Sequence, residues 1–116
     1  MDYLKFLKFL KNNFELSNKK FKSVSFFRSD LVLIFIWFFV LEKYYSKKKS
    51  SVEDLMSYIP RNIASRPTVY KFINQSCLKK YLFKIIDEKD KRKFDIQPSQ
   101  STIKEFEVWS SGFRGF

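Results

Sequence analysis

The chain has 116 residues, of which 45% are hydrophobic and 30% charged, and this composition is that of one globular domain. It contains no histidine, one cysteine and two glycines, which excludes histidine-based catalysis and metal binding, an intrachain disulfide and glycine-rich phosphate loops. Its formal charge of +11 attracts polyanions, so we expect a binding protein with no catalytic residues, no cofactor and no metal, and nucleic acid as the favoured partner.

The first predicted element is an amphipathic helix over residues 2–16. Its apolar residues recur at helical spacing: Tyr3, Leu7, Leu10 and Phe14. Its lysines recur every third residue on another face: Lys5, Lys8 and Lys11. We interpret the apolar stripe as a core or dimer contact, and the alternative is a helix that lies on a membrane surface. Residues 17–28 read as a loop or a short helix.

A run of eleven apolar residues follows at 31–41 and predicts a helix over about 30–46, capped by Ser29. A helix needs about 20 apolar residues to span a bilayer, so this run indicates a buried core helix rather than a membrane segment. We therefore expect a cytoplasmic protein. The basic run 47–49 suits a solvated helix end, and contact with a DNA backbone is its second interpretation.

Two shorter helices are predicted next. Ser51 begins a capping box for a helix over 52–59, which Pro60 ends and whose inner face is Leu55, Met56 and Ile59. After a turn at 61–64, Ser65 caps a longer helix over about 66–80, with Pro67 in its first turn. The inner face of that helix is Val69, Phe72, Ile73 and Cys77. We read Cys77 as a small buried hydrophobe, with a redox sensor as the alternative.

The pattern then changes to that of a β-hairpin. Residues 82–86 are β-rich, residues 87–92 form a charged tip, and residues 93–96 alternate polar and apolar side chains. Residues 97–99 break the second strand. Ser99 or Ser101 then caps a last helix that runs to about Ser111, with Ile103, Phe106 and Trp109 on its inner face.

This order of elements predicts a mainly α protein with a small hairpin, namely a winged helix-turn-helix. We expect one domain over 1–116, with dimerisation helices at 1–49, the helix-turn-helix and wing at 50–99, and a C-terminal helix at 100–116. In such a fold the second helix enters the major groove and the hairpin reaches the neighbouring backbone or minor groove. The predicted DNA-contacting residues are Ser65, Arg66, Thr68, Tyr70, Lys71 and Asn74 on the helix, and Lys89, Asp90, Lys91, Arg92 and Lys93 in the wing. Arg66 would read guanine or clamp a phosphate, and Asn74 would read adenine.

Residues 51–99 resemble the multiple-antibiotic-resistance regulator (MarR) family. The resemblance lies in Ser65-Arg-Pro-Thr-Val-Tyr-Lys-Phe-Ile73 at the start of the recognition helix, in Asp90-Lys-Arg92 at the wing, and in Ile96-Gln-Pro98 before the next helix. It implies that Arg92 enters the minor groove while Asp90 holds it in place. The glycine that the family often has between recognition helix and wing is replaced here by Lys80-Tyr81-Leu82, and the family's long C-terminal dimerisation helix is truncated.

The favoured hypothesis is thus a homodimeric transcriptional regulator that binds specific sequences in double-stranded DNA. RNA polymerase or another transcription protein is a possible further partner. The alternatives are a winged-helix adaptor that contacts proteins in a transcription or replication complex, and a membrane-surface protein that uses its first helix.

Overall fold

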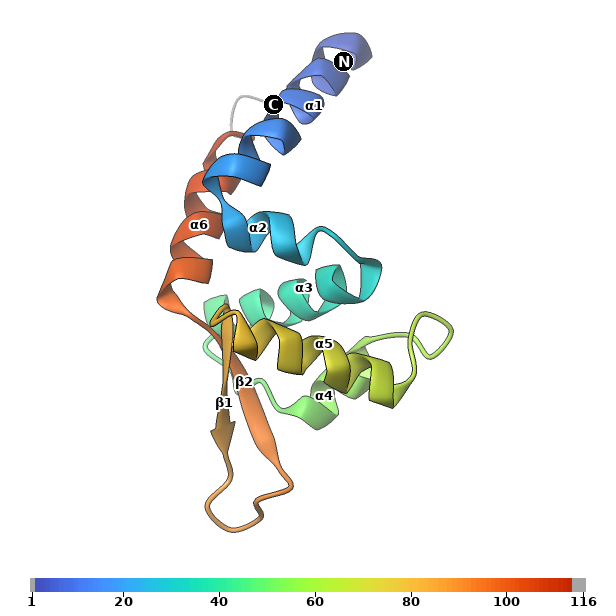
Figure 1. Cartoon of the computed structure of the whole chain (residues 1–116), viewed down its shortest axis with the longest axis vertical. Helices are drawn as coiled ribbons and strands as arrows, with labels where there is room; N and C mark the ends of the chain where they lie inside the picture. Colours follow the sequence, from blue (N-terminus) through green and yellow to red (C-terminus); the bar gives the residue numbers. More distant parts are fainter. Residues whose placement is uncertain (1, 114–116) are drawn as a thin grey trace.

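The computed structural model describes residues 2–113, apart from the side chains of residues 16–18. Residues 1 and 114–116, which include Gly115, lie outside this description. Within this range the chain is mainly helical, with one antiparallel hairpin (Figure 1). The elements are α1 (Tyr3–Lys20), α2 (Lys22–Phe27), α3 (Leu31–Tyr45), α4 (Val52–Tyr58), α5 (Arg66–Leu78), β1 (Leu82–Ile86), β2 (Phe94–Pro98) and α6 (Gln100–Ser111). The molecule extends over 53 Å, from the free end of α1 to the tip of the hairpin.

The long apolar helix α3 begins at a different cap from the one predicted. The Asp30 carboxylate accepts a hydrogen bond from the backbone N–H of Val32 at 2.8 Å, which makes Asp30 the N-cap. The predicted cap, Ser29, is wrong, because its hydroxyl donates instead to the carbonyl of Phe26 at 2.6 Å.

Two of the other predicted caps, Ser51 and Ser99, are confirmed. Ser51 accepts from the N–H of Asp54 at 3.2 Å and starts α4, as the capping box indicates. Of the two serines proposed for α6, Ser99 is the cap, since it accepts from the N–H of Thr102 at 3.3 Å. The short turn between α4 and α5 is closed by a backbone bond from Ile63 to Pro60 at 2.9 Å.

Helix α5 ends two residues earlier than predicted, at Leu78. The chain turns at Lys80, whose φ of 63° lies in the left-handed region that favours glycine. The N–H of Tyr81 then donates to the carbonyl of Ser76 at 3.0 Å, which closes a Schellman motif. The lysine therefore stands where a glycine would suit the backbone best.

The hairpin pairs Leu82 with Pro98 and Ile86 with Phe94. Its second strand differs from the prediction, since Lys93 belongs to the tip whereas Gln97 and Pro98 still belong to the strand. A proline is tolerated there because each strand of a two-stranded sheet is an edge strand.

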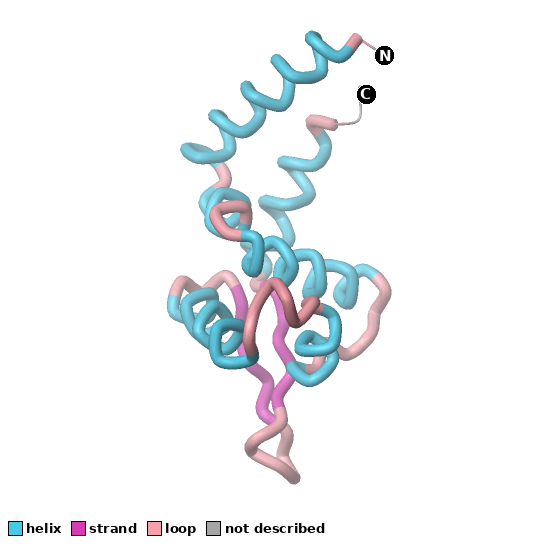
Figure 2. The backbone as a smooth tube through the Cα atoms, turned by 90° about the vertical axis from the view of Figure 1, so that its right-hand side faces the viewer, coloured by secondary structure: helices cyan, strands magenta, loops and turns pink. Residues whose placement is uncertain are grey.

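A short bridge ties the hairpin to the body of the protein. Ser51 pairs with Asp95, and the N–H of Ile96 donates to the carbonyl of Ser50 at 2.9 Å. The buried hydroxyl of Ser50 also bonds to the carbonyl of Ile96. The hairpin is therefore fixed on its β2 side before it projects away from the helices (Figure 2).

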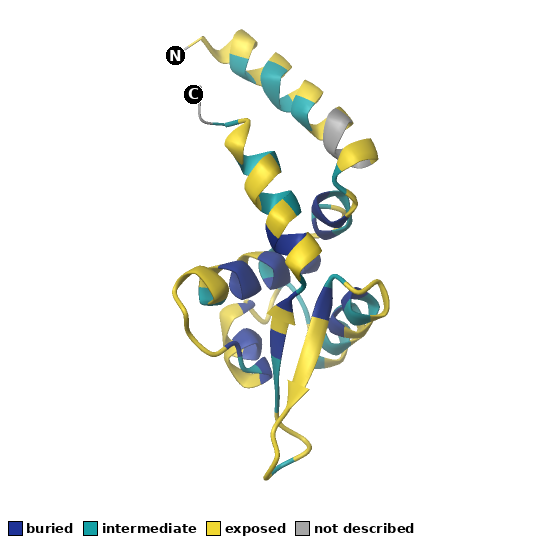
Figure 3. Ribbon diagram, turned by 90° about the vertical axis from the view of Figure 1, so that its left-hand side faces the viewer, coloured by how far each residue is buried: buried dark blue, intermediate teal, exposed yellow. Residues whose placement is uncertain are grey.

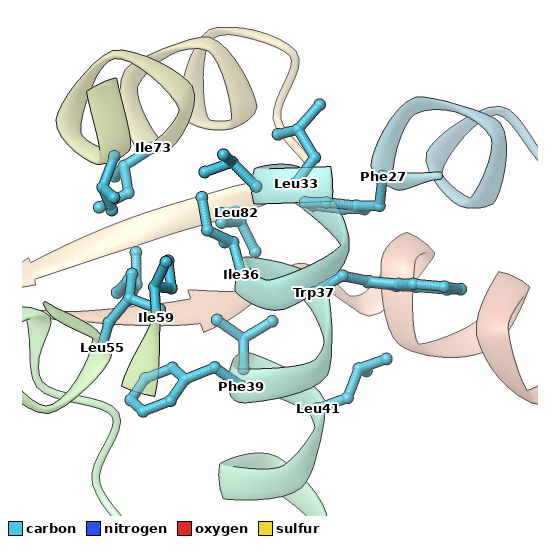
Figure 4. Close-up of a cluster of buried hydrophobic side chains, with 14 of the residues drawn as sticks. Phe27, Leu33, Ile36, Trp37, Phe39, Leu41, Leu55, Ile59, Ile73 and Leu82 are labelled. Atoms are coloured by element: carbon cyan, nitrogen blue, oxygen red, sulfur yellow. The ribbon is translucent and has the colours of Figure 1, made fainter. Parts of the chain in front are cut away.

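Helix α3 is the centre of the core (Figure 4). Within the run 31–41, Leu31 and Phe38 are the exposed residues, and most of the run is buried, as predicted. The other core side chains include those expected on α4, with Val69 and Ile73 from α5. Burial of each large side chain contributes about 1.5–3 kcal/mol to stability. No helix within the described residues is long and apolar enough to cross a bilayer.

The segment predicted as a loop or a short helix contains the end of α1 and all of α2. No side chain of α2 caps its start. Instead Glu105 of α6 accepts from the N–H of Ser23 at 2.9 Å and from its hydroxyl at 2.7 Å. Ser23 is completely buried, so this contact fixes α2 against α6.

The apolar stripe predicted on α1 is mostly exposed rather than in the core. Tyr3 and Leu7 are 73% and 61% exposed, and Phe14 is exposed as well. A neighbouring face packs toward α6, with the ring of Phe9 lying 5.3 Å from that of Phe113. Helix α1 therefore projects beyond the core with an apolar face open to solvent (Figure 3).

Candidate nucleic-acid interface

Arg66 stands in the first turn of α5, where the sequence places the start of a recognition helix. Its guanidinium lies 2.8 Å from the carboxylate of Glu53 on α4. The hydrogen bond and charge of Glu53 raise the pKa of Arg66, and both groups reach solvent. Glu53 was not predicted as a site residue, and its place in the first turn of α4 gave no signal beyond that of a helix start.

Ser65 and Thr68 lie together at the N-terminus of α5. Ser65 occupies the cap position as predicted, but its side chain does not bond to the helix backbone. Its hydroxyl lies 3.0 Å from that of Thr68. Two hydroxyl groups thus lie side by side at the N-terminus of α5, and hydroxyl groups can donate to an anionic oxygen.

The face of α5 beyond Arg66 is divided between solvent and the hairpin. Lys71 and Asn74 are exposed, as expected for an outward face, whereas Tyr70 is half-buried and its ring packs 6.3 Å from that of Phe94. Tyr70 was predicted to face outward, and it does so only in part, because its ring packs between α5 and β2. The structure does not present it as a free side chain.

Lys84 of β1 is a residue that sequence reasoning missed. Its ammonium group donates to the side-chain carbonyl of Asn74 at 2.8 Å and lies 4.9 Å from the centre of the Phe94 ring. This occupies the acceptor with which Asn74 would contact an adenine amino group. The alternation of β1 was the available signal, since it places Lys84 on the strand face that meets α5.

The hairpin tip is shaped by two aspartates. Asp87 accepts from the N–H groups of Lys89 at 2.7 Å and Asp90 at 3.2 Å. Asp90 accepts from the backbone of Arg92 at 3.0 Å and from its Nε at 3.2 Å. These bonds lower the pKa of Asp90, and the contact that the resemblance implies between the two side chains is present.

Arg92 itself points into solvent, with 92% of its side chain exposed. The predicted lysines of the tip are also exposed: Lys89, Lys91 and Lys93. The tip therefore carries four cationic side chains on a turn whose backbone is held by Asp87 and Asp90.

The helix and the hairpin border one groove. Glu53, Lys49 and Arg92 are among the residues that line an open groove of about 720 Å³ between α4 and the hairpin. Arg92 lines this groove, and so does Glu53, the carboxylate that binds Arg66. Its lining combines cationic side chains with the carboxylates of Asp87, Glu88 and Asp95, so the groove carries charges of both signs.

No protein-family model matches this sequence, and no curated protein is similar enough to count as a relative. The geometry and charge of α5 and the hairpin tip are therefore the basis for the function proposed below.

Proposed function

We propose that the chain is a winged helix-turn-helix protein that binds specific sequences in double-stranded DNA and regulates transcription. In this proposal α4 and α5 form the helix-turn-helix, and the hairpin is the wing. The observation that carries it is that Arg92 and Glu53, the carboxylate that binds Arg66, line one groove between α4 and the hairpin. Guanidinium groups bind both phosphates and guanine edges, which suits a protein with a charge of +11.

Helix α5 would enter the major groove with its N-terminus foremost. Arg66 would leave Glu53 to reach a guanine or a phosphate, while Ser65 and Thr68 would donate to a phosphate oxygen. The exposed Lys71 would contact the backbone one turn further along α5. Base contact by Asn74 would require its bond to Lys84 to open, so we assign sequence reading first to Arg66.

The hairpin would place Arg92 in the adjacent minor groove. Asp90 would orient the guanidinium, and the flanking lysines would neutralise phosphates on either side. This arrangement is the one that the resemblance to the MarR family implies, and we include membership of that family in the proposal.

A homodimer completes the proposal. Tyr3, Leu4 and Leu7 on α1 are each more than 60% exposed, and an exposed apolar face of this kind marks an interaction surface. In a two-fold dimer formed through α1, the two copies of α5 would bind half-sites separated by one helical turn of DNA, roughly 34–36 Å, or a multiple of it.

Selection from a pool of random duplexes tests this function. The whole chain should enrich duplexes that carry a pseudo-palindromic motif at low salt. At higher salt the enriched duplexes should match that motif more closely. The double variant Arg66→Ala/Arg92→Ala should lose the motif, while Lys8→Ala on α1, which also removes a positive charge, should keep it. No enrichment, or equal enrichment by both variants, would refute the proposal.

A further inference from the structure

A second groove lies at the root of the hairpin. It has a volume of about 290 Å³, and the end of α3, both strands and the start of α6 contribute to its walls. Its lining residues are Val40, Lys43, Tyr44, Lys47, Lys48, Ser50, Phe83, Gln97, Pro98, Gln100 and Ile103. Lys47 and Lys48 belong to the basic run 47–49, for which contact with a DNA backbone is the second interpretation, and the other lining residues are not assigned above to DNA contact.

The groove has an apolar floor and an aromatic rim. Val40, Pro98 and Ile103 are buried, whereas Tyr44 and Phe83 remain 43% and 45% exposed. Two large aromatic side chains thus present apolar surface to solvent on either side of a hollow. Such a hollow is the kind that accepts one bulky anchor side chain at a protein interface.

The charged groups at the rim all have one sign. Lys43, Lys47 and Lys48 line the groove, and its lining contains no carboxylate. Within the described residues none of the three forms an ion pair. The charge of this lining favours an anionic occupant, in contrast to the mixed lining of the groove beside Arg92. The ammonium of Lys43 also lies 5.6 Å from the centre of the Phe39 ring, toward a neighbouring hollow that Glu42 and Asp54 line.

The backbone that carries these lysines is held in place. Lys47 has a φ of 57°, in the left-handed region, and its N–H donates to the carbonyl of Tyr44 at 3.2 Å. The next N–H, that of Lys48, donates to the carbonyl of Lys43 at 2.9 Å. This Schellman motif ends α3 and directs the chain along the groove. A charged residue occupies a position where glycine would cost less.

The groove faces away from the surface proposed for DNA. Side chains alternate along β1, and Leu82 and Lys84 lie on the face that meets α5, where Lys84 bonds to Asn74. Phe83 lies on the opposite face with its cross-strand partner Gln97. In Figure 3 the hairpin stands in front and α5 lies to its right.

We propose that this groove binds an acidic amphipathic segment of another protein, which inserts one large apolar side chain and pairs its flanking carboxylates with the three lysines. Charge complementarity and the apolar floor select this occupant. A phosphate backbone would satisfy Lys43, Lys47 and Lys48 but would leave the exposed surfaces of Tyr44 and Phe83 without a partner. The proposal goes beyond DNA binding and does not depend on it.

Peptide display against the whole chain tests the proposal. The enriched peptides should carry a tryptophan, phenylalanine or leucine next to aspartates or glutamates. A synthetic copy of the most enriched peptide, labelled with fluorescein, should bind the Lys43→Glu/Lys47→Glu variant about tenfold or more weakly. Phe83→Ser should weaken it as well, while Lys5→Glu/Lys8→Glu, the matched change of charge on α1, should leave the affinity unchanged.

Three results would overturn the proposal. The first is enrichment of no peptide, or of peptides without acidic residues. The second is an equal loss of affinity in the α1 control, which would mean that only net charge matters. The third is a result in which no peptide binds and Lys43→Glu/Lys47→Glu loses as much DNA affinity as Arg92→Ala does. That result would mean that the lysines of the groove contact DNA phosphates. Thermal unfolding followed by circular dichroism shows whether each variant is folded. Phe83→Ser tests the apolar part of the groove without changing the net charge.

Discussion

Replacement of Lys80 by glycine should stabilise the protein. Lys80 has a φ of 63° at the end of α5, and the following N–H closes the Schellman motif with Ser76. A residue with a Cβ costs about 1–2 kcal/mol in the left-handed region. Glycine removes that cost, but it loses about 0.4–1 kcal/mol through the greater freedom of the unfolded chain. The net gain should be about 0.5–1 kcal/mol.

For a chain of 116 residues, this gain corresponds to a rise in melting temperature of about 2–4 °C. Thermal unfolding followed by circular dichroism measures it. The matched control is Lys79→Gly, which removes the same charge one residue earlier, where φ is −79°. There the added freedom of glycine has no strain to offset it, so we expect a loss of up to about 1 kcal/mol. Equal effects of the two substitutions, or destabilisation by Lys80→Gly alone, would refute the reasoning.

Three further predictions follow from single contacts. Glu53→Gln should raise DNA affinity by up to about fivefold, since it frees Arg66 from an exposed ion pair worth about 0.2–1 kcal/mol; unchanged binding in an anisotropy titration would contradict this. Burial raises the pKa of Tyr45 and Tyr58 to about 12, with help from a hydrogen bond to a glutamate in each case. A group whose pKa is higher in the folded than in the unfolded chain stabilises the protein fully below its unfolded pKa, and this stabilisation is lost as pH rises through the folded pKa. The free energy of unfolding should therefore fall between about pH 10 and 12, and it should fall less in the double variant Tyr45→Phe/Tyr58→Phe. Urea titrations at a series of pH values measure this. Burial also raises the pKa of the Cys77 thiol, so a disulfide reagent at pH about 8 should label it more slowly in the folded than in the urea-unfolded chain; equal rates would count against its packing.

The elements that carry local signals are those that the sequence predicts well. Ser51, Pro60 and Ser99 set helix ends through contacts with residues a few positions away. The hairpin is also predicted, because alternation and a charged tip are properties of one short segment. The Asp90–Arg92 pair lies within a single turn and is therefore visible in the motif.

What the sequence does not predict depends on contacts between distant segments. Helix α2 is fixed by Glu105, which is 82 residues away from Ser23. Arg66 is held by a residue of the preceding helix, and Asn74 by one of the following strand. The exposure of α1 was missed for the same reason, since a stripe at helical spacing shows that a face is apolar but not what covers it.

The salt dependence of DNA binding tests the central claim most directly. A duplex that carries the selected motif would be titrated between about 50 and 200 mM salt with the wild-type chain, Arg92→Ala and Lys8→Ala. The logarithm of the affinity should fall steeply with that of the salt concentration, and Arg92→Ala should reduce the slope by about one while Lys8→Ala leaves it unchanged. A flat dependence, or equal slopes for Arg92→Ala and the wild type, would contradict the proposed grip of helix and hairpin on DNA.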